Sequence, residues 1–207
     1  MEVTVRLEAG YEQALEGLSY NKKKEGRDMT NISGKLACVG GGHDQWMRQL
    51  MVWVDVNMPL SWWKQMDKYN YVIAQSLDEM MPDFHMIVTQ SESTMHTLAE
   101  RELSQADFRT NINISTLDYL NAILYDIKNC TDRDTKSELV NTLYDELPCG
   151  YLQKRKLMMS YAQIATIFGQ RKAHKLKAWK FFIKQLRDQL YHADILEKIF
   201  IKGKRLK

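Results

Sequence analysis

Two stretches of the chain alternate apolar and polar residues with the period of a β-strand. Val3, Val5 and Leu7 share one side of an opening strand. Between Leu50 and Val56 both sides are mostly apolar, which indicates a strand in the middle of a sheet. Apolar residues at helical spacing predict helices elsewhere, so we expect one unit of the α+β class. The predicted helices cover residues 11–18, 32–39, 61–69, 91–103, 117–127, 132–146 and 176–190.

Glycine, proline and small polar residues predict where these elements end. The helix that ends at Val39 is followed by three glycines, residues 40–42, which suit a left-handed helix cap. Pro59 and Ser61 open the helix that carries Trp62 and Trp63. Because adjacent residues lie on different faces of a helix, we expect one tryptophan in the core and the other toward a pocket or a partner subunit.

Several caps and turns are predicted from single polar residues. Ser91 or Ser93, Ser115 or Thr116, and Thr131 or Asp132 are suitable caps for the three helices that follow them. Residues 22–27 form a polar loop by composition, and residues 80–84 around Pro82 form a turn or a short insertion.

Length and composition are typical of one soluble globular domain, which we expect to span residues 1–207. Residues 198–207 are predicted to form a basic, frayed tail. The chain is 44% apolar. It lacks an apolar run long enough for a membrane span, and its charged N-terminus is unlike a signal peptide, so we expect a cytoplasmic protein. Three cysteines without CxxC spacing indicate reduced thiols. Five dispersed histidines suggest no metal site.

Charge is unevenly distributed although the net charge is only +3. Residues 154–156, 171–180 and 202–207 are basic, whereas residues 92–107 and 126–146 hold many acids. A basic C-terminal quarter can bind nucleic acid or a smaller anion, and it can equally be a solvated helix face with a frayed tail. For the chain as a whole we expect a small-molecule partner, with neither nucleic acid nor a membrane.

The sequence excludes several catalytic templates. Residues 40–42 are followed by His43 and Asp44, not by the lysine of a phosphate-binding loop. It contains neither a GxSxG elbow nor an HExxH zinc motif.

The segment Leu147–Trp179 is the most distinctive part of the sequence. It reads LPCGYLQKRKLMMSYAQIATIFGQRKAHKLKAW, an LP pair followed by a predicted strand, a helix, and then Arg171 and His174. Residues 42–44 come before a strand and a tryptophan pair, and residues 14–20 read ALEGLSY. In this order the segments resemble the flavin-dependent thymidylate synthases, the ThyX family. The resemblance implies the ThyX fold, with a central, mostly antiparallel sheet flanked by helices.

The chain departs from the ThyX pattern at the positions that carry the family's chemistry. Lys68-Tyr69-Asn70 stands where the family has its arginine-histidine-arginine motif, which removes positive charge needed for flavin and phosphate. Arg48 stands in place of a glutamate, and Tyr144 in place of an arginine that recognises the pyrimidine. Ser160 and Ala162 replace an asparagine and an arginine of the helix before Arg171.

The resemblance nevertheless assigns binding roles to a small set of residues. Arg171 and His174 would bind a nucleotide or another anion, helped by Glu92, Thr94 and His96. Each also has a structural explanation: Arg171 and His174 would stabilise the negative end of a helix, and residues 92–96 would form a helix cap. Were FAD retained, the resemblance would place it near Ser19, His43, Arg48 and Lys68, although His43 is also suited to cap a turn.

Two functions follow as hypotheses from this resemblance. The first is a nucleotide-binding protein on a ThyX-like scaffold, encoded by a bacteriophage and acting in the host cytoplasm, with degenerate or altered catalysis and a role such as nucleotide sequestration. The second is an active flavin-dependent methyltransferase converting dUMP or a related pyrimidine nucleotide. The resemblance also implies a homotetramer, and the aromatic helix over residues 61–71 suits a subunit interface.

Overall fold

The computed structural model describes residues 1–20, 28–71, 88–93 and 97–201. The chain is of the α+β class, as predicted, and its four-stranded antiparallel sheet has the order β1-β2-β4-β3. The four strands are β1 (Glu2–Ala9), β2 (Met51–Pro59), β3 (Val88–Ser91) and β4 (Leu152–Ser160). The predicted loop at 22–27 and the predicted turn at 80–84 lie outside the described residues.

The chain forms two compact units. Unit 1 comprises residues 1–2, 57–66 and 90–155, and unit 2 comprises residues 3–56, 67–89 and 156–207. The two long strands β2 and β4 contribute residues to both units. We describe each unit separately, and the extent of a single domain over residues 1–207 stays a prediction.

The central strand of the sheet follows the predicted pattern closely. Val52, Val54 and Val56 of β2 are fully buried on one face, and Met51, Trp53 and Asp55 on the other face are half-buried. On that second face, Asp55 accepts a hydrogen bond from Arg6 Nε at 2.7 Å and pairs with Lys156 Nζ at 2.5 Å. The hydrogen bond from Lys156 lowers the pKa of Asp55, burial opposes it, and Arg6 lowers it further.

β1 is an edge strand whose outer side is bonded to a side chain. The Val5 amide donates to Gln189 Oε1 at 3.0 Å, and Gln189 Nε2 donates to the Val3 carbonyl at 2.7 Å. One glutamine amide thus occupies both backbone groups that a neighbouring strand would bond. β1 is followed by Gly10, where φ is +90° and an added Cβ would stand 2.3 Å from the Gln49 carbonyl oxygen, so glycine is required there.

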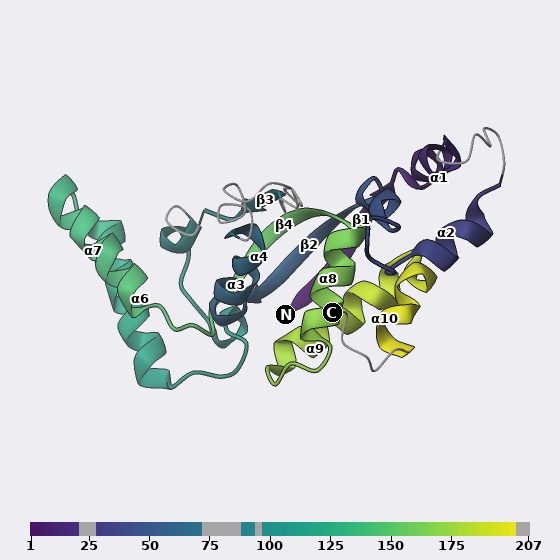
Figure 1. The fold of residues 1–207 in the computed structure, drawn as a ribbon. Helices are drawn as coiled ribbons and strands as arrows, with labels where there is room; N and C mark the ends of the chain where they lie inside the picture. The colour runs from purple at the N-terminus through teal and green to yellow at the C-terminus, as the bar shows by residue number, and fades with distance from the viewer. Residues whose placement is uncertain (21–27, 72–87, 94–96, 202–207) are drawn as a thin grey trace. The chain divides into compact units, whose positions relative to one another are not determined.

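The helices of unit 2 are recognisable in Figure 1 by their labels. α1 (Tyr11–Tyr20) contacts the short 3₁₀-helix η1 (Gln45–Arg48), and α8 (Tyr161–Arg171) contacts both α9 (Lys177–Gln189) and α10 (Glu197–Ile201). The core of this unit is aromatic, with Tyr161, Phe168, Trp179 and Phe182 fully buried. The remaining elements are α2 (Thr30–Leu36), α4 (Lys68–Tyr71) and the 3₁₀-helix η4 (Ala193–Leu196).

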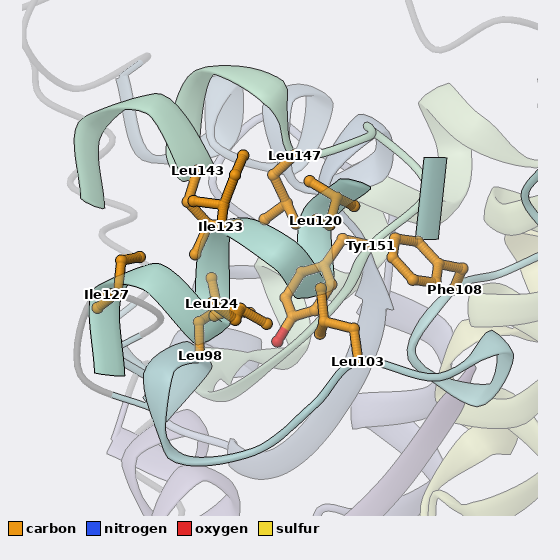
Figure 2. Close-up of a cluster of buried hydrophobic side chains, with 10 residues drawn as sticks. All are labelled: Leu98, Leu103, Phe108, Leu120, Ile123, Leu124, Ile127, Leu143, Leu147 and Tyr151. Atoms are coloured by element: carbon orange, nitrogen blue, oxygen red, sulfur yellow. The ribbon is translucent and has the colours of Figure 1, made fainter. Parts of the chain in front are cut away.

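Unit 1 is built around a helical hairpin. α6 (Ile114–Asn129) packs against α7 (Arg133–Glu146), and the Asn113 and Asp132 side chains cap them by accepting from the Ser115 and Thr135 amides. Ten buried side chains form the core beneath the hairpin, as Figure 2 shows. They are Leu98, Leu103, Phe108, Leu120, Ile123, Leu124, Ile127, Leu143, Leu147 and Tyr151. The smaller elements of this unit are α3 (Leu60–Met66), η2 (Leu98–Glu100) and η3 (Gln105–Asp107).

Four local predictions were wrong. The helix expected to end at Val39 ends at Leu36, because Cys38 takes a left-handed conformation with φ of 56° before the glycines. The helix expected over 91–103 does not begin at Ser91, which belongs to β3, and Glu92 pairs with β4 through its amide and the Lys154 carbonyl; described helical structure in this range is limited to Thr97 and η2. Asn113, not Ser115 or Thr116, caps α6. Trp62 and Trp63 are both buried, at 0% and 1% exposure.

Candidate anion-binding site

The junction of β4 and α8 sets the position of Arg171. Ser160 ends the strand and caps the helix: its Oγ accepts from the Gln163 amide at 3.3 Å, and its own amide donates to Gln163 Oε1 at 2.6 Å. α8 then buries Ile164, Ile167 and Phe168 and ends at Arg171. The order predicted from the sequence, an LP pair, a strand, a helix and then an arginine, is therefore confirmed in the fold.

Arg171 contacts two aromatic rings. Its guanidinium carbon is 5.0 Å from the centroid of the Trp179 ring and 5.4 Å from that of Tyr69. Its Nε donates to Tyr69 Oη at 2.7 Å. Tyr69, Gln170, Arg171, His174 and Trp179 are called the Arg171 cluster below; all five belong to unit 2.

The Tyr69 hydroxyl links this arginine to its neighbour. It accepts from Arg171 and donates its single proton to Gln170 Oε1 at 3.1 Å. Burial raises the pKa of Tyr69, although the hydrogen bond from Arg171 and the charge of Arg171 lower it. The phenol therefore stays protonated at neutral pH and keeps both bonds, which hold the guanidinium by Nε and leave its two terminal nitrogens to other partners.

Charge in the cluster is unbalanced. Within the part of the chain that the structure describes, no carboxylate forms an ion pair with Arg171. Arg171 is the last residue of α8, where it also meets the negative end of the helix dipole, so the helix-end explanation accounts for part of its placement. A planar guanidinium held from one side can still bind two oxygens of a phosphate.

His174 follows in the turn after α8 and is half-buried. Its amide donates to the Arg171 carbonyl at 2.9 Å, and its Nδ1 accepts from the Leu176 amide at 3.1 Å. Because Nδ1 is the acceptor, the neutral imidazole carries its proton on Nε2, which remains a donor. Its ring centroid lies 6.3 Å from that of Trp179. The structure thus brings the two residues Arg171 and His174 together on one aromatic residue.

Glu92 lies in unit 1 in a separate set of contacts. Its amide donates to the Lys154 carbonyl at 2.9 Å, and its Oε1 accepts from Thr97 at 3.2 Å. In the same unit, Arg155 stacks on Trp63 at 4.4 Å. Its Oε2 accepts from the Lys154 amide at 3.3 Å, so the carboxylate lies beside β4. Thr94 and His96 lie outside the described residues.

The four residues expected near FAD share no described hollow. Ser19 is 1% exposed and donates its hydroxyl to the Glu16 carbonyl at 2.6 Å, whereas His43, Arg48 and Lys68 are exposed. One surface hollow of unit 2 is lined by β1, Gln189, Tyr191 and His192, and another by α9 and Phe200; none of the four residues lines either. Neither hollow therefore brings these four residues together, and we derive no chemistry through a flavin.

Sequence reasoning missed the residues that hold Arg171. Tyr69 was expected only as a neutral replacement within a lost motif, and Trp179 only as part of the apolar side of the last helix. Tyr69 and Arg171 are 102 residues apart, so no local pattern links them. The one signal in the sequence for a role of Tyr69 was that it is an aromatic residue at a position where the family has a charged motif.

The described residues offer no candidate metal centre. They hold no group of three or more histidine, cysteine or acidic side chains arranged to bind a metal ion. In the same residues, no helix is both long enough and apolar enough to cross a membrane.

Comparison with known proteins places the fold. No family model and no curated protein matches the sequence. A crystal structure of thymidylate synthase X (ThyX) from Helicobacter pylori with FAD and dUMP matches with a TM-score of 0.71 and 13% identity, covering 98% of this chain and 100% of that chain. A second structure of flavin-dependent ThyX from Helicobacter pylori, complexed with FAD and dUMP, has a TM-score of 0.67 and 12% identity, with 100% of each chain covered. The chain described here therefore has a ThyX-like fold.

Proposed function

We propose that the protein binds a nucleotide through its phosphate at the Arg171 cluster. The observation that carries the proposal is the guanidinium of Arg171, oriented by Tyr69 and Trp179 and lacking an acidic partner among the described residues. A nucleotide is favoured over other anions because both similar solved structures contain dUMP. His174 Nε2 supplies a second donor at the same aromatic wall.

Binding without the ThyX reaction is the form of this function that we favour. Lys68-Tyr69-Asn70 contributes a neutral phenol to the Arg171 cluster where the family has a charged motif. The residues expected near flavin share no described hollow in one chain. Both observations are consistent with a degenerate or altered enzyme that sequesters a nucleotide. We propose that a bacteriophage encodes the protein and that it acts in the host cytoplasm.

The test is calorimetric titration of the purified protein with dUMP. A charged hydrogen bond is worth about 1.5–3 kcal/mol, so Arg171→Ala should weaken binding by about 10–150-fold. Arg6→Ala is the matched control, because it removes the same charge from unit 2 at an arginine paired with Asp55. Equal dUMP affinity in wild type and Arg171→Ala, with both proteins folded, would assign Arg171 to the helix end and overturn the proposal.

An absorbance spectrum distinguishes the alternative function, an active flavin-dependent methyltransferase, from nucleotide binding alone. A flavin absorbance band in the freshly purified protein, or its appearance on adding FAD, would favour the enzyme. A colourless protein that releases or exchanges a nucleotide on heating, identified by mass spectrometry, would favour the binding protein.

A homotetramer is the assembly that we propose. Light scattering during size-exclusion chromatography would measure the mass directly. A monomer at micromolar concentration would contradict any model in which subunits share a site.

A further inference from the structure

Helix α9 carries an unusual density of positive charge. Its residues 177–189 include four lysines and arginines and a single acid, Asp188, in a chain whose net charge is only +3. The opposite face of α9 is fixed by burial of Trp179, Phe182 and Leu186, each 0% exposed. The cations are therefore held on a rigid helix and not on a loop.

Four of these cations form a stripe along one side of α9. Lys177, Lys180, Lys184 and Arg187 follow at intervals of three, four and three residues, so they stay on the same side of an α-helix. With a rise of about 1.5 Å per residue, the stripe is roughly 15 Å long, and its neighbouring Cα positions are about 4.5–6 Å apart along the axis. Successive phosphates on one strand of a duplex are separated by about 3.4 Å along the axis, a spacing of the same order.

Two residues at the N-terminal part of the stripe are free to bind. Among the described residues, neither Lys177 nor Lys180 forms an ion pair, and both are exposed. Lys184 and Arg187 pair with Asp188 and Glu197, both at the surface. Such exposed pairs contribute only about 0–1 kcal/mol each, so a phosphate can replace the carboxylate at small cost.

A small hollow lies beside the stripe. It has a volume of about 200 Å³, and it is lined by four cations, by one acid and by two apolar side chains: Lys172, Lys180, Lys184, Arg187, Asp188, Ile183 and Phe200. Arg187 stacks on Phe200 with its guanidinium carbon 4.7 Å from the ring centroid. Proteins that bind single-stranded nucleic acid combine cations, which neutralise the phosphates, with aromatic side chains, on which the bases stack. The cations and the Phe200 ring of this hollow offer the same combination.

We propose that the stripe of α9 binds the phosphate backbone of a nucleic-acid strand without reading its sequence. This proposal goes beyond nucleotide binding at the Arg171 cluster and uses different residues. It also revises the expectation from the sequence that nucleic acid is no partner. Counting charges did not show that four cations share one side of a helix whose opposite side is buried.

The experiment measures fluorescence anisotropy of a labelled mixed-sequence oligonucleotide of about 20 nucleotides over a range of salt. Each neutralised phosphate of a single strand contributes about 0.7 to the slope of log K against log salt. The triple variant Lys177→Gln, Lys180→Gln, Lys184→Gln should therefore lower the slope by about 2 and weaken binding at low salt by at least tenfold. Glutamine keeps helix propensity close to that of lysine, and circular dichroism checks the fold.

The matched control removes three charges from unit 1. Lys128→Gln, Arg133→Gln, Lys136→Gln changes three exposed cations of the α6–α7 hairpin by the same amount and should leave the slope within about 0.5 of wild type, well under the change expected for one phosphate. Equal loss in both triple variants would show that net charge alone governs binding and would overturn the proposal. Absence of oligonucleotide binding by wild type at low salt, or binding only to vesicles of anionic lipid, would overturn it as well.

Nucleotide titration separates this proposal from the previous one. The α9 triple variant should bind dUMP like wild type, and Arg171→Ala should keep most of its oligonucleotide affinity. If dUMP binding fails and the oligonucleotide result holds, only the Arg171 proposal is lost; the reverse outcome removes only the α9 proposal.

Discussion

The α6–α7 hairpin and the α8–α9 helices use charged residues in opposite ways. Residues 114–146 hold seven acids and three bases, and the structural acid Asp132 caps α7 by accepting the Thr135 amide. Residues 171–189 hold seven bases and one acid. There Arg171 is oriented by aromatic rings, and Lys177 and Lys180 form no ion pair with any described residue. Unpaired cations on a rigid framework distinguish a binding region from one whose polar groups complete the fold.

The largest expected effect tests whether the hairpin is structural. Leu120 is fully buried in the cluster of Figure 2, so Leu120→Ala should lower the free energy of unfolding by about 2–5 kcal/mol. Ile114 is 71% exposed on the same helix, and Ile114→Ala should change it by less than about 0.5 kcal/mol. Urea denaturation followed by circular dichroism measures both. A drop in dUMP affinity of the folded Leu120→Ala protein would contradict the view that the hairpin is structural and plays no part in binding.

A smaller effect is expected at the hydroxyl that orients Arg171. Tyr69→Phe keeps the ring beside Arg171 and removes the acceptor of its Nε proton. Tyr69→Phe leaves the guanidinium in place and removes only its orienting bond, so it should cost about 1–2 kcal/mol and weaken dUMP binding by about 5–30-fold while the protein stays folded, less than Arg171→Ala. Calorimetric titration of the three proteins gives the order. If Tyr69→Phe bound as tightly as wild type, the phenol would be a neighbour of Arg171 and not its positioning residue.

The smallest effect concerns acid stability in unit 1. The side-chain hydrogen bond from Arg101 lowers the pKa of Asp107, with burial opposing and the Ser104 bonds assisting. A carboxyl whose folded pKa lies below the ordinary 3.8 stabilises the fold above that pH, and the contribution is lost as the pH falls through the folded pKa. Asp107→Asn should flatten the fall in stability below about pH 4, measured by urea denaturation at each pH. Arg101→Ala removes the same pair from the other side and should flatten it similarly; an unchanged slope in both would exclude this pair as a cause of acid unfolding.

Elements whose folding is decided locally were predictable from the sequence. β1, the buried face of β2, α7 and α9 each follow from a periodic pattern, and Asp132 caps α7 as expected. The Ser91–Leu103 segment failed because its polar residues suit a helix cap, whereas its backbone bonds to β4 through Glu92. Pairing between segments far apart in the chain overrides local propensity, and a single sequence gives no record of it.

The candidate site was predictable only in part, for the same reason. Arg171 and His174 came from the order of motifs along the chain, and the structure places both at Trp179. Tyr69 arrives from a segment 102 residues away and could not be assigned. The basic character of the C-terminal quarter was visible in the composition, but its organisation on α9 depended on knowing which face is buried.

The glutamine that bonds the edge of β1 has a consequence for synthesis. Val3 leaves the ribosome 186 residues before Gln189. At about 5–20 residues per second, the strand waits on the order of 10–40 seconds for this partner. Throughout that interval two backbone groups of a β-prone segment are open to pairing with any other nascent chain. Dense translation of one message would therefore favour aggregation of incomplete chains, and a chaperone that shields β1 until α9 is made would reduce it.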